Sequence, residues 1–541
     1  MKLLRVKVVS AATCGGLLDG FELWFRSADV EAPSFTPLCL VGPNGSGKSQ
    51  LMQILAEMFQ SLIHECNRNE ERAETNPNLQ FELEYLIRPK PGNEVVHIRV
   101  SRIAHGKQRP KLIIQRRVDL EWIDCDLHAP ATQQLLPRKV VGYTSGDNET
   151  LSLPFLASRG GYAEDVSQMA LEETKDSSPV TDTRLMLIDY GTHLEVLVAN
   201  LLLGNVPQRN ALLKDALVKD LHSFRCIVQL SHSAAPRVSR TKASASGRKG
   251  VQLTAELEKY IDQLRRCSTC HDYDKETETY TFDYYLDEQT RNAFAFFWDS
   301  AFGLYSSFHK LSMLNDLAIP KIARERSRKD AEARRFAARL PEPQDEDKIF
   351  RFQRVTFRAQ SGNQEVDYVS ISDGEHQLIQ VLGIFCMLSF PNVIFLLDEP
   401  ESHFNPVWRV KFLSLIRDLP TANGDRSGAT PAAEQDCIMT THAPFVPSDM
   451  SRDRVFIFKK ENGKVIAQHP DIETYGTNFD AVLEECFGVH PPISDLPKED
   501  IARLMKSRSP KEIEEGIKRL GNSVDKVFLA DRLRQLQKKD G

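Results

Sequence analysis

The chain has 541 residues, of which 41% are hydrophobic and 27% charged, with a formal net charge of −6 at pH 7. It is long enough for more than one domain, and because no run of 18 apolar residues occurs, the sequence predicts no membrane span. The net negative charge excludes a surface that is basic throughout, although it leaves room for local basic patches.

The ten cysteines show no framework spacing. Since a chain of this size needs no disulfides to fold, we interpret them as reduced thiols of a cytoplasmic protein. The N-terminal sequence MKLLRVKVVS alternates like a strand, and its apolar part is too short for a secretory leader, so we expect no signal peptide.

The first motif is a phosphate-binding loop between a strand and a helix. Residues 37–41 form a short apolar run typical of a buried parallel strand, and residues 50–63 carry apolar side chains at helical spacing. Between them, a G-x-x-x-x-G-K-S motif is made by Gly42, Pro43, Asn44, Gly45, Ser46, Gly47, Lys48 and Ser49. Such a loop turns backbone N–H groups around a triphosphate, while its lysine reaches the β- and γ-phosphates and its serine binds Mg²⁺. The pattern therefore predicts binding of ATP with Mg²⁺.

A long segment separates this loop from the remaining motifs. Residues 191–222 have a helical pattern, residues 224–231 and 279–286 a strand pattern, and residues 288–317 a helical one again. Because no heptad pattern persists, we expect a globular insertion of mixed α and β structure rather than a long coiled coil.

Three features of this segment have two interpretations each. Cys267, Cys270 and the adjacent His271 match half of a zinc site, but a second pair of ligands is not evident, so two unbound thiols are the simpler reading of the pattern. The basic stretches 236–250 and 321–339 are either solvated surface or contacts for nucleic acid or for an acidic partner.

The second half of the nucleotide site follows near residue 400. Residues 393–397 have the pattern of a buried strand that ends in Asp398 and Glu399. A carboxylate at this position can hold Mg²⁺, which is the predicted role of Asp398. Glu399 is placed to polarise the attacking water as a general base.

Two further elements flank this strand. Ser372 and Gly374 precede a strongly apolar helix, and a helix N-terminus capped by serine can also bind an anion. Residues 437–441 form another apolar strand, which ends in His442. We interpret His442 as a residue that can contact the γ-phosphate.

In this order, the four elements resemble the head of the ABC-type ATPases: phosphate loop, signature helix, Asp-Glu strand and switch histidine. The resemblance implies that Ser372 and Gly374 close on ATP held by a second copy, and that residues 401–406 form a dimer-contacting loop. It also implies a loop residue that senses Mg²⁺, for which Asn148 is the local candidate. The signature departs from the family pattern, because Asp373 replaces its first glycine.

Four segments resemble more narrowly the PtuA-type ATPases of the Septu and retron anti-phage defence systems. They are PLCLVGPNGSGKS, GYTSGDNETLSLPF, ISDGEHQLIQVLG and LLDEPESHFNPVWRVKF. The resemblance covers the nucleotide-binding head and leaves most of the insertion unassigned. It implies an HNH nuclease partner, PtuB, and in retron systems a reverse transcriptase with its RNA–DNA product.

The C-terminal part gives no sign of a nuclease of its own. After His442 come a hairpin pattern with the turn signal Asn462-Gly463 and a charged helical tail from residue 497 to 541. A metal-binding nuclease domain would need a strand-borne Glu followed by an Asp-x-Asp pair, which this segment lacks.

Together these features predict an α/β fold, an ABC-type P-loop NTPase head with a mixed α+β insertion and a helical C-terminal tail. The expected parts are residues 1–155 and 346–490 for the head, 156–345 for the insertion and 491–541 for the tail. The predicted function is an ATPase that pairs with itself, as a dimer or higher oligomer, to control a nuclease. The alternative is a stand-alone ATPase of DNA repair or maintenance that resembles the RecF and Rad50 group. A transporter motor is disfavoured by the large insertion and the nonstandard signature.

Overall fold

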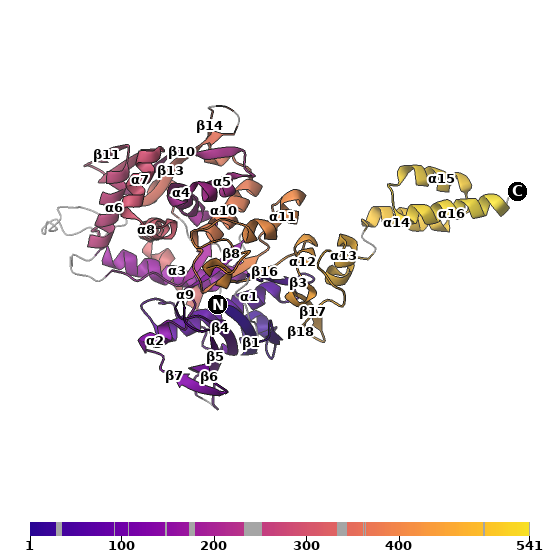
Figure 1. Cartoon of the computed structure of the whole chain (residues 1–541), viewed down its shortest axis with the longest axis horizontal. Coiled ribbons are helices and arrows are strands. Elements are labelled where there is room, and N and C mark those ends of the chain that lie inside the picture. Colours follow the sequence, from indigo (N-terminus) through magenta and orange to yellow (C-terminus); the bar gives the residue numbers. More distant parts are fainter. Residues whose placement is uncertain are drawn as a thin grey trace.

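The computed structural model describes residues 1–28, 35–90, 92–106, 108–145, 149–171, 179–231, 251–332, 343–360, 362, 364–490 and 493–539. Asn148 and the basic stretch 236–250 lie outside the described residues, as do residues 333–339. In the described body, a central sheet lies between a sheet made from the N-terminal part and a third sheet further along the chain (Figure 1).

The central sheet has seven strands in the order β18-β17-β3-β16-β15-β8-β9. They are β3 (Leu38–Val41), β8 (Lys139–Thr144), β9 (Leu185–Ile188), β15 (Val393–Asp398), β16 (Asp436–Thr440), β17 (Val455–Glu461) and β18 (Lys464–Gln468). Neighbouring strands run parallel except in the hairpin of β17 and β18, which turns at Asn462 and Gly463. The strands predicted at 37–41, 393–397 and 437–441 are thereby confirmed.

Both faces of the central sheet are buried, which explains why its strands are continuous apolar runs. In β15, Ile394 and Leu396 belong to the core shared with the N-terminal sheet, whereas Phe395 and Leu397 belong to the core on the opposite side. Successive side chains of a strand point to opposite faces, so a run without polar residues requires cover on both.

The N-terminal sheet has six antiparallel strands in the order β2-β1-β4-β5-β6-β7. They are β1 (Lys2–Ser10), β2 (Glu22–Trp24), β4 (Gln80–Ile87), β5 (Val96–Ile103), β6 (Lys111–Val118) and β7 (Glu121–Cys125). Helix α1 (Lys48–Cys66) contributes most of its residues to the core between this sheet and the central one. The short helix α2 (Pro130–Gln133) precedes β8. The helix predicted after the phosphate loop is thus confirmed as a buried element.

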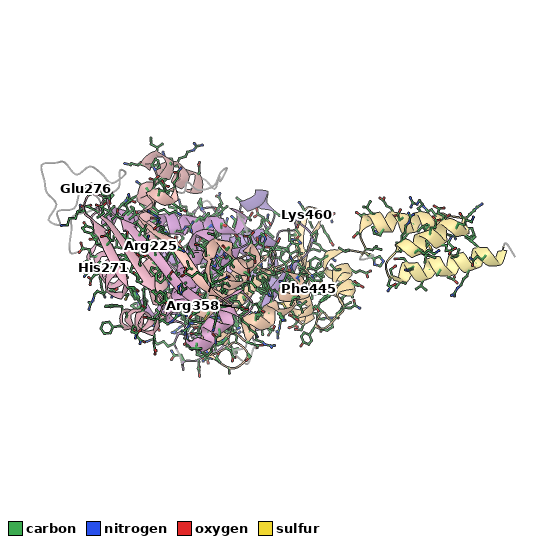
Figure 2. All side chains as sticks on the ribbon, turned by 90° about the horizontal axis from the view of Figure 1, so that it is seen from above. Arg225, His271, Glu276, Arg358, Phe445 and Lys460 are labelled. Carbon is green, nitrogen blue, oxygen red and sulfur yellow. The ribbon has the colours of Figure 1, made fainter. Side chains whose placement is uncertain are left out.

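The third sheet is antiparallel and has five strands in the order β11-β12-β10-β13-β14. They are β10 (Val218–Gln229), β11 (Cys270–Asp274), β12 (Thr279–Tyr285), β13 (Phe350–Ala359) and β14 (Glu365–Asp367). The sequence predicted a helix through residue 222, which is wrong, because β10 already begins at Val218 and pairs with β13 there. Figure 2 shows Arg225, His271 and Arg358 on this sheet.

Helices lie around the third sheet and join it to the centre. They are α3 (Glu149–Met169), α4 (His193–Leu203), α5 (Val206–Leu213), α6 (Ala255–Cys267), α7 (Glu288–Phe297), α8 (Ala301–Met313), α9 (Lys321–Glu332) and α10 (Asp373–Met387). Residues 156–345 contribute β9 to the central sheet and β10 to β12 to the third sheet, which also contains β13 and β14. This segment is therefore shared between two sheets.

The C-terminal tail stands apart from the body (Figures 1 and 2). After α11 (Pro406–Arg417), α12 (Phe445–Ser448) and α13 (Phe479–Phe487), it consists of α14 (Asp495–Lys506), α15 (Pro510–Arg519) and α16 (Val524–Lys539). Its small core is made by Ile501, Leu504, Ile513 and Leu529. The predicted helical tail is confirmed.

Two absences hold for the described part of the chain. None of its helices is long and apolar enough to cross a membrane. Nor does it bring three or more His, Cys, Asp or Glu side chains together as a metal site. Cys267 is buried and Cys270 exposed, each with a free thiol.

Candidate nucleotide site

The phosphate loop connects the end of β3 to the start of α1 through a backbone that requires glycine. Gly42 has a φ of 131°, and a Cβ added there would lie 2.3 Å from the carbonyl oxygen of Phe458 in β17. Gly45 and Gly47 have φ values of 75° and 103°. L-residues with a side chain rarely adopt such values, whereas glycine does so freely. The loop is therefore shaped before any ligand enters.

Lys48 is the first residue of α1 and lies under the loop. Its Nζ donates hydrogen bonds to the carbonyl oxygens of Gly42 (2.9 Å) and Pro43 (3.1 Å). Burial lowers the pKa of Lys48, against the opposing effect of Glu399 and Asp398. Among the described residues, the buried hydroxyl of Ser46 has no hydrogen-bond partner. An ammonium group and an unpaired hydroxyl at a helix N-terminus suit a phosphate group.

Asp398 lies at the end of β15, across β16 from the phosphate loop. Its Oδ1 accepts hydrogen bonds from the hydroxyls of Ser49 (3.0 Å) and Thr440 (2.5 Å). Burial is the main reason why its pKa is raised. A buried carboxylate next to a serine hydroxyl is a donor set that fits Mg²⁺, and a bound cation would oppose this shift.

Glu399 follows directly and points into the same pocket. Its backbone has a φ of 48°, and its N–H donates to the Thr440 hydroxyl at 3.0 Å. A positive φ is unfavourable for a residue with a side chain and persists where the surroundings fix it, often at functional sites. His442 Nε2 lies 3.3 Å from Glu399 Oε1, and both side chains remain partly exposed. Burial, followed by the charge of Lys48, lowers the pKa of His442.

The phosphate loop, Glu399 and His442 line one open hollow of about 180 Å³, and Asp398 lies buried behind Ser49. Its walls are formed by residues 44–50, Glu399 and His442, and by Thr150 at the start of α3. The structure therefore brings together the phosphate loop, the acidic pair and the histidine from three parts of the sequence. Parallel strands make this possible, because their carboxyl ends meet at the same edge of the sheet.

The predicted signature residues do not line this hollow. Ser372 is exposed and caps α10, whose N-terminus packs against the segment that follows the acidic pair. A Cβ added to Gly374 would lie 2.9 Å from the carbonyl oxygen of His403. Gln377 accepts a hydrogen bond from the His403 N–H at 3.1 Å. The signature helix and the predicted dimer-contacting loop thus form one packed unit.

Three threonines were missing from the sequence-based site. Thr440 contacts both acidic residues, Thr150 lines the hollow, and Thr441 donates to the buried carboxylate of Glu401. Thr440 could have been found from its place at the end of β16, next to His442. Thr150 gives no comparable signal, because it follows the loop that holds Asn148 and does not stand at the end of an apolar strand.

A family model described as "AAA domain, putative AbiEii toxin, Type IV TA system" matches residues 271–449. No curated protein matches the chain. The matched range contains β15 and β16 with Asp398, Glu399 and His442, and the phosphate loop joins it through the central sheet. Fold and site together define the protein as a P-loop NTPase. The family match further supports a generic ATPase.

Proposed function

We propose that this protein is an ATPase of the ABC type, in which two copies pair around ATP. The observation that supports pairing is the separation of the two half-sites within one chain. The hollow of the phosphate loop is open to solvent at Asn44 and Gly45, whereas the exposed Ser372 caps a different helix. A second copy, facing the first, would supply Ser372 and Gly374 to the open side.

Each residue of the hollow has a chemical role in this proposal. Lys48 leaves the two loop carbonyls and binds the β- and γ-phosphates. Glu399 accepts the proton of the attacking water, and His442, held near its carboxylate, orients that water and contacts the γ-phosphate. Asp398 and Ser49 would hold Mg²⁺, which neutralises phosphate charge when it is bound.

Pairing gives ATP a means to control an effector. ATP held between two sets of donors binds the paired copies more tightly than the separate ones. This difference in affinity shifts the equilibrium toward the paired state. Hydrolysis removes that difference and lets the copies separate. An effector that binds one state better than the other would be switched by the nucleotide.

The proposed biological role is that of an ATPase subunit in cytoplasmic anti-phage defence. It is supported by the resemblance of four sequence segments to PtuA-type ATPases and by a matching family whose description includes a toxin. The proposed partners are an HNH nuclease, PtuB, and in a retron setting a reverse transcriptase with its RNA–DNA product. Co-purification with the product of the adjacent gene tests this assignment.

Pairing itself is tested with the Glu399→Gln variant, which should bind ATP without hydrolysing it. We expect its mass in solution to double, or to rise to a higher multiple, when ATP and Mg²⁺ are added. Adding Ser372→Arg places a long cation at the contact and should prevent this increase while ATP binding remains. If the double variant assembles as before, the composite-site proposal is wrong.

A second candidate is a DNA-repair ATPase of the RecF type. It is favoured by α9, where the side chains of Lys321 and Arg326 are 81% and 84% exposed. This alternative predicts that duplex DNA alone stimulates hydrolysis and that the effect falls steeply as salt rises. Absence of stimulation at low salt would exclude it.

A further inference from the structure

The signature serine is bound to a carboxylate of its own helix. Glu375 is the third residue of α10, and its Oε2 accepts hydrogen bonds from the Ser372 N–H (3.1 Å) and from the Ser372 hydroxyl (2.6 Å). The usual return bond, from the Glu375 N–H to the Ser372 hydroxyl, is long at 3.4 Å. In an ordinary capping box the glutamate binds only the backbone N–H of the cap. Here it also accepts a hydrogen bond from the hydroxyl of the cap.

The other oxygen of Glu375 binds a distant part of the chain. Oε1 accepts a hydrogen bond from the Leu217 N–H at 2.8 Å, just before β10 of the third sheet. The segment around Leu217 is held from β13, because the Gln360 side chain donates to the Ala216 carbonyl and the Gln360 N–H to that of Leu217. Glu375 is therefore fixed at both oxygens.

Glu375 is ionised in this setting. Only 5% of its surface is exposed, and burial by itself would raise its pKa. The hydrogen bonds from Ser372 and Leu217 outweigh burial and lower the pKa of Glu375. A charged acceptor at 2.6 Å makes a strong hydrogen bond, so the Ser372 hydroxyl keeps its proton directed toward the carboxylate.

This arrangement conflicts with a contact between Ser372 and ATP. A hydroxyl has one proton to donate, and phosphate oxygens only accept. While the proton of Ser372 is directed to Glu375, the hydroxyl presents only its lone pairs to an incoming triphosphate. Both these lone pairs and the anionic carboxylate of Glu375 repel the phosphate oxygens. The hydrogen bond to Glu375 must break before the Ser372 hydroxyl can donate to a phosphate.

We infer that Glu375 is a positioning residue that restrains ATP-dependent pairing by holding the hydroxyl of Ser372, and that the third sheet sets this restraint through Leu217. The inference rests on the proposed pairing of two copies. Since Leu217 is 76% exposed, a partner bound at this end of β10 could reach the contact from outside. Pairing would then require a higher ATP concentration than it would without the restraint.

The test compares Glu399→Gln with Glu399→Gln/Glu375→Gln in the full-length protein. A glutamine keeps the size and an acceptor oxygen for Leu217, while its amide nitrogen replaces the oxygen that faces Ser372. The Ser372 N–H then loses its acceptor, and the Ser372 hydroxyl receives a hydrogen bond from the amide, so its own proton becomes available. We expect the ATP concentration for half-maximal assembly, measured by mass photometry or light scattering, to fall about tenfold. If Glu375 had only a structural role, this change would leave that concentration the same or raise it.

Two controls make the result specific. In a Ser372→Ala background, Glu375→Gln should no longer lower the ATP requirement, because the hydroxyl that it frees is absent. Glu512→Gln removes a carboxylate from the corresponding position of α15 in the tail and should have no effect.

Failures of the inference and of the proposed function give different results. Assembly at the same ATP concentration with and without Glu375→Gln would overturn the inference alone. So would an effect that persists without the Ser372 hydroxyl. No ATP-dependent assembly in either variant would overturn the proposed pairing and the inference together.

Discussion

The phosphate-loop end and the signature end of this ATPase are held in different ways. At the phosphate loop, contacts join the ends of neighbouring strands: Ser49 and Thr440 both bind Asp398. At the signature end, Ser372 is bound to Glu375, which also binds Leu217 just before β10 of the third sheet. The contacts of the first end lie within the central sheet, whereas those of the second end reach the third sheet. Under the proposed pairing, control could therefore act on assembly without disturbing nucleotide binding by a single copy.

The largest expected effect comes from removing the cation of the phosphate loop. Lys48→Ala should weaken ATP binding on the order of 100-fold or more, because a desolvated ammonium contact to phosphate is lost. Titration with a fluorescent ATP analogue measures this change. If the variant binds as tightly as the unmodified protein, the loop is not the nucleotide site and the contrast between the two ends disappears.

At the signature end, adding one methyl group in Gly374→Ala should weaken the pairing of two copies without weakening ATP binding by one copy. In Gly374→Ala the new Cβ meets the His403 carbonyl at 2.9 Å, and the backbone must shift. We expect a loss of about 1–2 kcal/mol of stability and of ATP-dependent assembly, while the ATP affinity of unpaired copies, measured at low protein concentration, stays unchanged. The matched control is Gly160→Ala in α3, where no atom lies within 4 Å of the added Cβ. A drop in the ATP affinity of unpaired Gly374→Ala copies would show that the two ends are not independent.

The sequence predicted the phosphate-loop end well because its signals are local. A glycine-rich motif and buried strands that end in charged residues are visible in short windows, and parallel pairing then places Asp398 beside Ser49. The signature end was only half predictable. Ser372 and Gly374 could be named, but Leu217 lies 158 positions from Glu375.

The predicted helix through residue 222 was wrong for a related reason. Residues 211–222 carry apolar side chains at spacings that fit a helix, but Val218 pairs with Ala359 of β13. Strand pairing with a segment far along the chain decided the local structure, and no short window contains that information. The roles of all the predicted site residues in binding and hydrolysis stay predictions, and Asn148 lies outside the described residues.

The next expected effect is at Glu401, whose burial should make the free energy of unfolding depend on pH. Burial raises its pKa from 4.5 to about 7, although Thr441 donates to it. Between these values the folded state keeps the proton that the unfolded state has lost, so this group's contribution to stability falls as pH rises from 4.5 to 7. Glu401→Gln removes the titration.

We therefore expect Glu401→Gln to have a free energy of unfolding about 2 kcal/mol larger than that of the unmodified protein at pH 8, and so to unfold at a higher denaturant concentration. At pH 5 the two proteins should differ little. Denaturant unfolding at both pH values measures the difference. Equal stability of the two proteins at pH 8 would contradict the prediction and would mean that the ionised carboxylate is well solvated or paired.

The smallest expected effect isolates the backbone strain at Glu399. Glu399→Gly and Glu399→Ala both remove the proposed general base, so hydrolysis should be lost in both. Only alanine retains the cost of a Cβ at a φ of 48°. The glycine variant should therefore be more stable than the alanine variant by about 1 kcal/mol, even though glycine ordinarily lowers stability through the entropy of the unfolded chain. Denaturant unfolding of the pair measures this difference. If the alanine variant is the more stable of the two, the backbone at Glu399 is not strained, and its positive φ does not lower the stability of the fold.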